Sequence, residues 1–401
     1  MLASERAASA SHVKIEVWEA EMMRRRDVLG LLAAAALPWP RPARATQAML
    51  DESVGFAGQI LFLSIKTPAL VLGVVRDGQT SIQGFGRRAD NADEAPGAGT
   101  LFRIGSVTKA FTGQVLASLA ADGVVSLADP LTKYCPEFAA PLSEGGRPIR
   151  LIDLATHSAG LPREVPHEGG PPDDPFVNIT PEAFAGWLKA NPLMFTPGTA
   201  ISYSNFGFDL LAVALARAAH QPYPDLLEAR VLRPLGLRDT TYAPSTGQTA
   251  RVTQGHNFDG SPLPVAKTGD VIVGSGGLYS TARDLLGWLE WHLDRFGNER
   301  AAERLIDHAA YLWRDGLSAV FGMDESGHMD AMGLAWVIMA PEGDRPLILQ
   351  KAGGLEGIFS YVAFAPARNI GVVAAVNAFD VAAGLAMART ANDLTAELAP
   401  R

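Results

Sequence analysis

Segments with β-strand character occur near both ends of this chain, and a long region with helical periodicity separates them. Near the start, residues 69–75 (ALVLGVV) and 81–86 (SIQGFG) flank Asp77-Gly78, a pair typical of a hairpin turn. Near the end, apolar runs alternate with turn residues, as in an antiparallel meander, at residues 333–341, 346–354, 359–366 and 370–377. Pairing of both chain ends in one sheet is the simplest arrangement that satisfies these strands.

The middle of the chain carries apolar residues at helical spacing, for example at residues 207–220 (GFDLLAVALARAAH). Residues 282–293 (ARDLLGWLEWHL), after the middle region, have the same spacing. We therefore predict an α/β (α+β) fold in which both chain ends form an antiparallel sheet flanked by helices. The sheet lobe is expected at about residues 46–105 and 275–401, with a mostly helical lobe inserted at about 106–274. Residues 162–180, rich in proline, predict an irregular loop that is either a rim of the site or a connector.

The first 45 residues have the features of an export signal. Arg24–Arg26 precede the apolar run Val28–Leu37, and Ala43-Arg44-Ala45 follows as a cleavage sequence of the Ala-x-Ala kind. The run is shorter than the about 20 residues that span a bilayer, so a membrane anchor is the less favoured alternative. We interpret residues 1–21 as a mis-started leader, 22–45 as a twin-arginine signal peptide and 46–401 as a single periplasmic catalytic domain, with at most peripheral membrane association.

Charge and cysteine content narrow the classes of partner. The net charge is −9 at pH 7 and remains negative without the first 45 residues, which argues against nucleic-acid binding. Cys135 is the only cysteine, so the chain has no internal disulfide and no cysteine pair for a metal. We expect Cys135 to be a small buried side chain and predict neither a metal nor an organic cofactor.

The sequence Ser-Val-Thr-Lys at residues 106–109 opens a helical stretch. A spacing of three places the Ser106 hydroxyl and the Lys109 amine on the same face of a helix. A serine needs an adjacent base to become a nucleophile, and lysine can be that base only when it is neutral, which requires desolvation or a second cation. The spacing alone is not specific, because Ser11-x-x-Lys14 in the leader matches it too.

The residues around this motif make it informative. Lys109 is the only charged residue between Ser106 and Ala121, and the two sides of the helix carry apolar or small residues. A helix that is apolar all round is a buried helix, and a buried lysine is rare without a partner or a function. The alternative is that Ser106 caps the helix and Lys109 extends to the surface. We favour Ser106 as nucleophile and Lys109 as its base.

A second motif, Tyr203-Ser204-Asn205, lies just before the helix that begins near Phe206. A tyrosine there can pass a proton to a leaving group, and an amide can orient the substrate and the lysine. We assign Tyr203 a catalytic role and Asn205 a substrate-binding role. The alternative is that Asn205 is a helix N-cap and Tyr203 a packing residue.

A third, cationic element has two candidates, Lys267-Thr268-Gly269 and Lys351-Ala352-Gly353. The role requires a strand whose N–H completes an oxyanion hole, with a cation directed at the substrate carboxylate. Only Lys351 follows an apolar run inside the strand meander, so we prefer it, with Gly353 and Gly354 beside it and Gly354 as the second N–H donor. His157, within ATHSAGLP, is expected to be a structural histidine, because a lysine-based site needs none.

These motifs occur in the order Ser-x-x-Lys, Tyr-x-Asn and Lys-x-Gly, and the chain thereby resembles the superfamily of class C β-lactamases and low-molecular-weight penicillin-binding proteins. The stretches LPRE (161–164), GSGGLYST (274–281) and QKAGGLEGIFSYVAFAP (350–366) are similar to the AmpH-type D-alanyl-D-alanine carboxypeptidase/endopeptidases. The resemblance implies a β-lactamase/transpeptidase-like fold and places Asn377 in the pocket for a substrate carboxylate. Ala352 stands where the family usually has threonine or serine, which removes a hydroxyl from that pocket.

The function that we predict is acyl transfer on peptidoglycan peptides through an acyl-enzyme, with β-lactams as further ligands. A class C-like β-lactamase or an esterase would use the same residues and differ in which acyl-enzyme is released quickly. A non-catalytic penicillin-binding sensor, which would be acylated once without turnover, is an alternative of another class.

Overall fold

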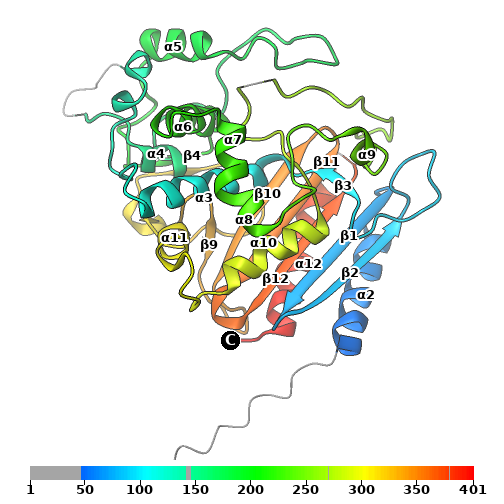
Figure 1. Ribbon diagram of the computed structural model, residues 1–401. Coiled ribbons are helices and arrows are strands. Elements are labelled where there is room, and N and C mark those ends of the chain that lie inside the picture. The colour runs from blue at the N-terminus through cyan, green and yellow to red at the C-terminus, as the bar shows by residue number, and fades with distance from the viewer. Residues whose placement is uncertain (1–46, 141–145, 270, 379) are drawn as a thin grey trace, which may run out of the picture. The chain divides into compact units, whose positions relative to one another are not determined.

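The computed structural model describes residues 47–140, 146–269, 271–378 and 380–401, and residues 47–401 form one compact unit. The predicted leader and signal peptide lie outside the described residues. An eight-stranded sheet is the centre of the fold (Figure 1). Its strands in spatial order are β2 (Gln79–Gly86), β1 (Ala69–Arg76), β12 (Ile370–Val376), β11 (Ile358–Ala365), β10 (Ile348–Leu355), β9 (Val337–Met339), β8 (Ala331–Met332) and β6 (Leu312–Trp313).

The two ends of the chain meet in this sheet, as the sequence predicts. β1 pairs antiparallel with β12, Leu70 opposite Val376 and Arg76 opposite Ile370. β1 and β2 form the predicted hairpin, and β9 to β12 form the predicted meander. The prediction of an antiparallel sheet flanked by helices is therefore confirmed.

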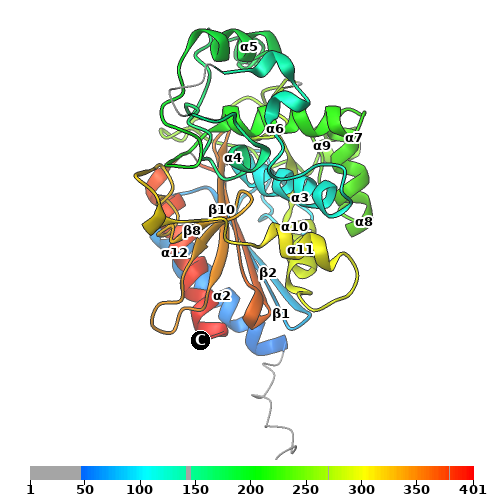
Figure 2. The same ribbon diagram turned by 90° about the vertical axis from the view of Figure 1, so that its left-hand side faces the viewer.

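Both faces of the sheet are covered, because alternate residues of a strand point to opposite sides. On β1, Val71 and Val75 enter one apolar core, and Leu72 and Val74 enter another. The second core lies under α2 (Gln47–Ser64) and α12 (Val381–Leu398), whereas α10 (Ala282–Leu293) covers the first, as Figures 1 and 2 show. With both faces buried, the central strands are continuously apolar instead of alternating with polar residues.

The helices between β3 and β5 lie above and beside the sheet. They are α3 (Thr108–Ala121), α4 (Leu151–Ala155), α5 (Pro181–Ala190), α6 (Asn205–Ala218), α7 (Tyr223–Leu227), α8 (Arg233–Leu235) and α9 (Thr246–Thr249), and α11 (Ala301–Asp307) follows α10. α3 is buried from Thr108 to Leu119, which agrees with its lack of charged residues other than Lys109. Cys135 is a free, buried cysteine in the same core.

Two short strand pairs hold the segments that meet near the start of α3. β3 (Leu101–Arg103) pairs with β5 (Tyr279–Thr281), and β4 (Ile201–Ser202) runs parallel to β7 (Val320–Phe321). The proline-rich segment 162–180 contains neither helix nor strand, as predicted. Among the described residues, no helix combines the length and the apolar character needed to cross a membrane.

Candidate active site

Ser106 lies in a single 3-10 turn, Gly105–Val107, that links β3 to α3. Gly105 has a positive φ of 47°, and a Cβ atom there would come within 2.6 Å of the Gly354 backbone nitrogen. Only glycine allows this approach without strain. Ser106 makes no capping hydrogen bond to α3, and its side chain remains partly exposed. The turn thus presents the hydroxyl at the surface of the site.

The Lys109 amine is completely buried and lies next to Ser106. Its Nζ is 3.0 Å from Ser106 Oγ, and it donates to Asn205 Oδ1 at 2.6 Å and to the Ser275 carbonyl at 2.6 Å. The side chain is 0% exposed. Lys109 therefore does not extend to the surface.

Burial has a large effect on this amine. The pKa of Lys109 is lowered to about 7, mainly because burial deprives the charged form of its hydration, and the nearby Arg163 acts in the same direction. The carboxylates of Asp209 and Glu164 act in the opposite direction. A substantial fraction of Lys109 is thus neutral near pH 7 and can accept a proton.

Tyr203 and Asn205 reach the same place from the start of α6. Tyr203 donates from its hydroxyl to Ser106 Oγ at 2.5 Å. Ser204, and not Asn205, is the N-cap of the helix, because its Oγ accepts from the Gly207 N–H at 2.9 Å. Since Asn205 does not cap the helix, its amide contacts two other side chains. Its Oδ1 accepts from Lys109, and its Nδ2 donates to Glu164.

The third element is provided by β10. Lys351 is 4% exposed, and its Nζ lies 4.9 Å from the centre of the Tyr203 ring. Burial lowers the pKa of Lys351, Tyr203 raises it, and the proximity of Lys109 lowers it. Lys267, the other candidate, is exposed on a loop.

Two glycines bring β10 against the nucleophile turn. β10 pairs with β9 only over residues 348–350, so among the described strands none pairs with this edge of β10 from Lys351 onward. A Cβ atom on Gly353 would come within 2.8 Å of the Ser106 backbone nitrogen. The main chain at Gly353 and Gly354 therefore abuts residues 105 and 106, and Gly354 is exposed at the site.

Four further residues surround this cluster, and sequence reasoning missed most of them. Asp209, one helical turn after Asn205, accepts from the Ser275 N–H and hydroxyl, both at 2.9 Å, and thereby fixes the carbonyl that accepts from Lys109. Glu164 contacts Asn205, and the Arg163 guanidinium lies 4.8 Å from the Tyr203 ring centre. The segment that begins at residue 162 therefore forms part of the rim. The spacing of Asn205 and Asp209 was the available signal for Asp209.

His157 is a structural residue, as expected. Its Nδ1 accepts from the Ser204 N–H at 3.0 Å, and its ring stacks on Tyr203 with centroids 4.6 Å apart. Burial lowers the pKa of His157 well below its usual value, so the imidazole is neutral. His157 supports the position of Tyr203 from behind.

Asn377 does not join the cluster, and its predicted place in a carboxylate pocket is not supported by the geometry. The side chain is 1% exposed. Its Oδ1 accepts from the Ala69 N–H at 2.7 Å, and its Nδ2 donates to the Gln254 carbonyl at 3.0 Å. Both ends of the amide hold backbone segments together, at the junction of β1 and β12. The substrate-binding role of Asn377 stays a prediction, because these contacts do not test it.

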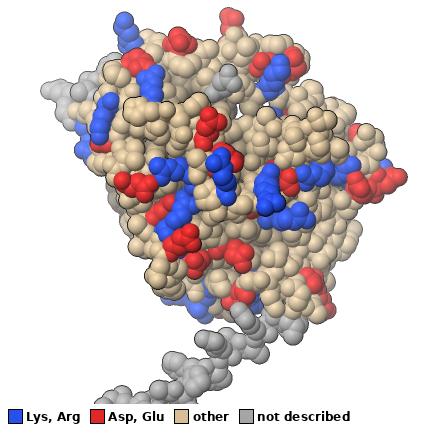
Figure 3. Space-filling model, in the orientation of Figure 1, with Lys and Arg blue, Asp and Glu red and all other residues tan. Residues whose placement is uncertain are grey.

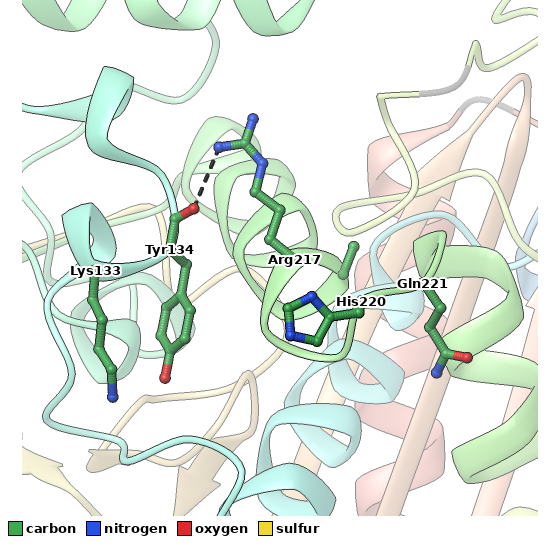
Figure 4. Close-up of a pocket in the computed structure, with 6 residues that line it drawn as sticks. Lys133, Tyr134, Arg217, His220 and Gln221 are labelled. Atoms are coloured by element: carbon green, nitrogen blue, oxygen red, sulfur yellow. Dashed lines mark hydrogen bonds between the residues drawn. The ribbon is translucent and has the colours of Figure 1, made fainter.

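A surface hollow elsewhere on the molecule carries no comparable chemistry. It lies between α6 and the segment before α4, and its lining is Lys133, Tyr134, Ala216, Arg217, His220 and Gln221 (Figure 4). Its two cations are paired, Lys133 with Asp129 and Arg217 with Glu137. On the face shown in Figure 3, acidic and basic side chains are mixed.

A partly exposed serine hydroxyl, a desolvated lysine and a tyrosine within hydrogen-bonding distance define a serine hydrolase with lysine in the place of histidine. Residues 45–397 match the Beta-lactamase family profile, and the chain belongs to this family. It is 37% identical to the D-alanyl-D-alanine-carboxypeptidase/endopeptidase AmpH of Escherichia coli strain K12, over 91% of this chain and 92% of that protein. The resemblance seen in the sequence is thereby confirmed.

Solved structures agree with this family. The crystal structure of a β-lactamase/D-alanine carboxypeptidase from Yersinia pestis, complexed with citrate, has a TM-score of 0.78 and 36% identity, and the match covers 88% of this chain and 99% of that one. A class C β-lactamase mutant matches with a TM-score of 0.73 at 19% identity, over 89% and 99% of the two chains. The predicted β-lactamase/transpeptidase-like fold is confirmed.

Proposed function

We propose that this protein is a periplasmic serine hydrolase that cleaves D-alanyl-D-alanine peptides of peptidoglycan through an acyl-enzyme and also binds β-lactams. The observation that carries the proposal is the 3.0 Å contact between the buried Lys109 amine and Ser106 Oγ. The AmpH relative, with 37% identity over nearly the whole chain, supports the substrate class. The signal-like segment in residues 22–45 supports export, which we propose to follow the twin-arginine route.

In the proposed acylation step, neutral Lys109 accepts the proton of Ser106, and Ser106 Oγ attacks the substrate carbonyl carbon. The backbone N–H groups of Ser106 and Gly354 stabilise the oxyanion. Tyr203, at 2.5 Å from Ser106 Oγ, delivers a proton to the departing amine as the C–N bond breaks. Water then hydrolyses the acyl-enzyme: the Tyr203 phenolate left by the first step takes a proton from the attacking water, and Lys109 returns its proton to Ser106 Oγ as the ester C–O bond breaks.

Substrate binding is assigned to the groups at the edge of the cluster. Lys351 supplies a positive charge for a substrate carboxylate, and Asn205, Gly353 and Gly354 line the approach to Ser106. None of these steps uses a metal or an organic cofactor.

The test is to incubate purified residues 46–401 with a muropeptide ending in D-Ala-D-Ala, a fluorescent penicillin, a chromogenic cephalosporin and a short-chain nitrophenyl ester. Release of free D-alanine and labelling of Ser106 are expected. Rapid turnover of the cephalosporin or the ester without any D-alanine would show a β-lactamase or an esterase instead. Labelling without turnover of any substrate would show a sensor.

Asp209→Asn should shift the acidic limb of the kcat/KM profile to lower pH. The groups that face Lys109 are Asp209 and Glu164, which raise its pKa, and Arg163, which lowers it. Burial raises the pKa of Asp209 itself to about 8, so only its ionised fraction acts on Lys109. Removing that charge lowers the pKa of Lys109, so the amine stays neutral, and active as a base, at lower pH. The measurement is kcat/KM against pH for the variant and the parent protein.

Asp284→Asn is the matched control, because Asp284 is also a buried aspartate that accepts from a backbone N–H and a hydroxyl, those of Asp239 and Thr240. It does not face Lys109, so its profile should coincide with that of the parent protein. An Asp209→Asn profile that does not move, or moves to higher pH, contradicts the role given to Asp209.

Ala352→Thr should strengthen binding of substrates that carry a free carboxylate. The change restores a hydroxyl beside Lys351, and a hydrogen bond to a charged group contributes about 1.5–3 kcal/mol, roughly a 10- to 150-fold decrease in KM. A neutral nitrophenyl ester should show no such change, and it serves as the internal control. Equal effects on both substrates would contradict a carboxylate pocket at this position.

A further inference from the structure

Three side chains of metal-binding type meet away from the serine site, between α10 and the end of α11. His292 Nδ1 lies 2.8 Å from His308 Nε2 and 3.6 Å from Asp307 Oδ2, and His308 Nε2 lies 3.8 Å from the same oxygen. The side chains of His292 and Asp307 are 0% exposed and that of His308 is 13% exposed. None of the three has a part in the proposed acyl transfer.

One oxygen of the Asp307 carboxylate lacks a hydrogen-bond partner among the described residues. Asp307 Oδ2 accepts from the Trp336 indole N–H at 2.9 Å, but Oδ1 is buried without a hydrogen-bond partner among the described residues. Within the same residues, no lysine or arginine forms an ion pair with Asp307. A buried, ionised carboxylate without a cation is costly.

Hydrogen bonds within the cluster leave two buried polar atoms unsatisfied. His292 Nδ1 and His308 Nε2 are hydrogen-bonded to each other at 2.8 Å. His292 Nε2, like Asp307 Oδ1, is buried without a partner among the described residues. Asp307 Oδ2 lies beyond hydrogen-bonding distance of both ring nitrogens.

The two histidine–aspartate separations fit the edges of a metal coordination polyhedron, whereas the two imidazoles are at hydrogen-bond distance from each other. In a tetrahedral site with N and O ligands at about 2.0–2.1 Å, ligand atoms lie about 3.3–3.4 Å apart. The two histidine–aspartate separations are slightly wider than this, and the histidine–histidine separation is narrower by about 0.5 Å, which a small rotation of the partly exposed His308 ring can open. Neutral imidazole is also the form that binds a metal.

We propose that His292, Asp307 and His308 form a structural site for a divalent metal ion of the zinc type, separate from the serine site. Two imidazoles and one carboxylate suit Zn²⁺ or Co²⁺. His308 also lines a hollow beside the cluster, together with Arg295, Arg304 and Leu349 among others, whereas His292 and Asp307 do not line it. Arg304 lies beside this hollow, but its Nη2 donates to the Gly297 and Glu299 carbonyls.

The position of the proposed metal site indicates which helices an ion would hold together. Its ligands come from α10 and from the end of α11, so the ion links two helices across the segment 294–300. α11 packs against α3, and Trp288 of α10 donates to Gln114 of α3. An ion there would stabilise the support behind the helix that carries Lys109, without taking part in the chemistry.

The test uses the purified chain, first analysed for metal content and then freed of metal with a chelator. Titration with Co²⁺ should give the visible absorption of a four-coordinate ion that saturates at one equivalent, and Zn²⁺ should displace it. Zn²⁺ in excess should raise Tm by a few degrees, since an ion that binds only the folded state stabilises it. Absence of saturable one-equivalent binding to this protein would overturn the proposal.

Variants locate the ion. His308→Ala and Asp307→Asn should lose the Co²⁺ absorption and the Tm shift. His328→Ala is the matched control, because His328 also has two carboxylates nearby, Asp324 at 3.6 Å and Asp330 at 3.7 Å, but is exposed. It should retain both signals. Unchanged binding in His308→Ala, or loss in His328→Ala, would contradict the assignment, and if a substituted chain does not fold, the titration of the parent protein decides alone.

Discussion

Replacing Lys109 with methionine should lower the rate of Ser106 acylation by about 10²–10⁴-fold, the usual contribution of a general base. Methionine fills a similar volume in the buried site but cannot accept the proton of Ser106. Asn205 Oδ1 and the Ser275 carbonyl would each lose a donor, at about 1–3 kcal/mol for a buried acceptor. The measurement is the second-order rate of labelling by a fluorescent penicillin, with Tm recorded alongside.

Lys133→Met is the control for this change. Lys133 is an exposed lysine on another part of the surface, paired with Asp129 at 2.9 Å, and exposed pairs contribute about 0–1 kcal/mol. Its variant should be labelled at the parental rate. If Lys109→Met were also labelled at that rate while remaining folded, Lys109 would not be the base.

Gly105→Ala should reduce kcat by about 10²–10³-fold, the cost of losing one oxyanion-hole donor. The new Cβ would lie 2.6 Å from the Gly354 nitrogen, so either the turn or β10 must move. Because Ser106 and Gly354 carry the two proposed N–H donors, a displacement of either one separates them. We expect weak turnover with substrate binding at Lys351 largely retained.

Gly123→Ala separates this effect from backbone strain. Gly123 also has a positive φ, of 73°, but a Cβ there would meet nothing within 4 Å. Both variants bear the strain of a left-handed residue, about 1–2 kcal/mol, and should show similar losses of Tm from this cause. Equal activity of the two variants would contradict the close approach of Gly105 and Gly354 as the reason for the loss.

The elements of the fold were largely predictable, because their signals are local. The Asp77-Gly78 hairpin, the C-terminal meander and the helix at 282–293 follow from periodicity and turn residues, and the structure has all three. The absence of charge around Lys109 likewise predicted a buried helix. Local pattern did not reveal the short pairs β3–β5 and β4–β7, because each joins segments far apart in the sequence.

The candidate site was predictable only where the motif itself carries the chemistry. Ser106, Lys109, Tyr203 and Lys351 do come together. Their orienting partners lie on other segments and were not found, Ser275 being 166 residues from Lys109 and Glu164 41 residues from Asn205. The role of Asn377 could not be decided from the sequence, since an amide that satisfies two backbone groups looks the same there as one that binds substrate.

By itself, the sequence determined that a hydroxyl and an amine stand one helical turn apart in an apolar helix, because the helix period and the side-chain types are properties of neighbouring residues. Only the tertiary structure decided that the pKa of this amine falls to about 7. Its protonation depends on how completely water is excluded, and on the distances to Asp209, Glu164 and Arg163, all of which are set by packing between segments that are remote along the chain.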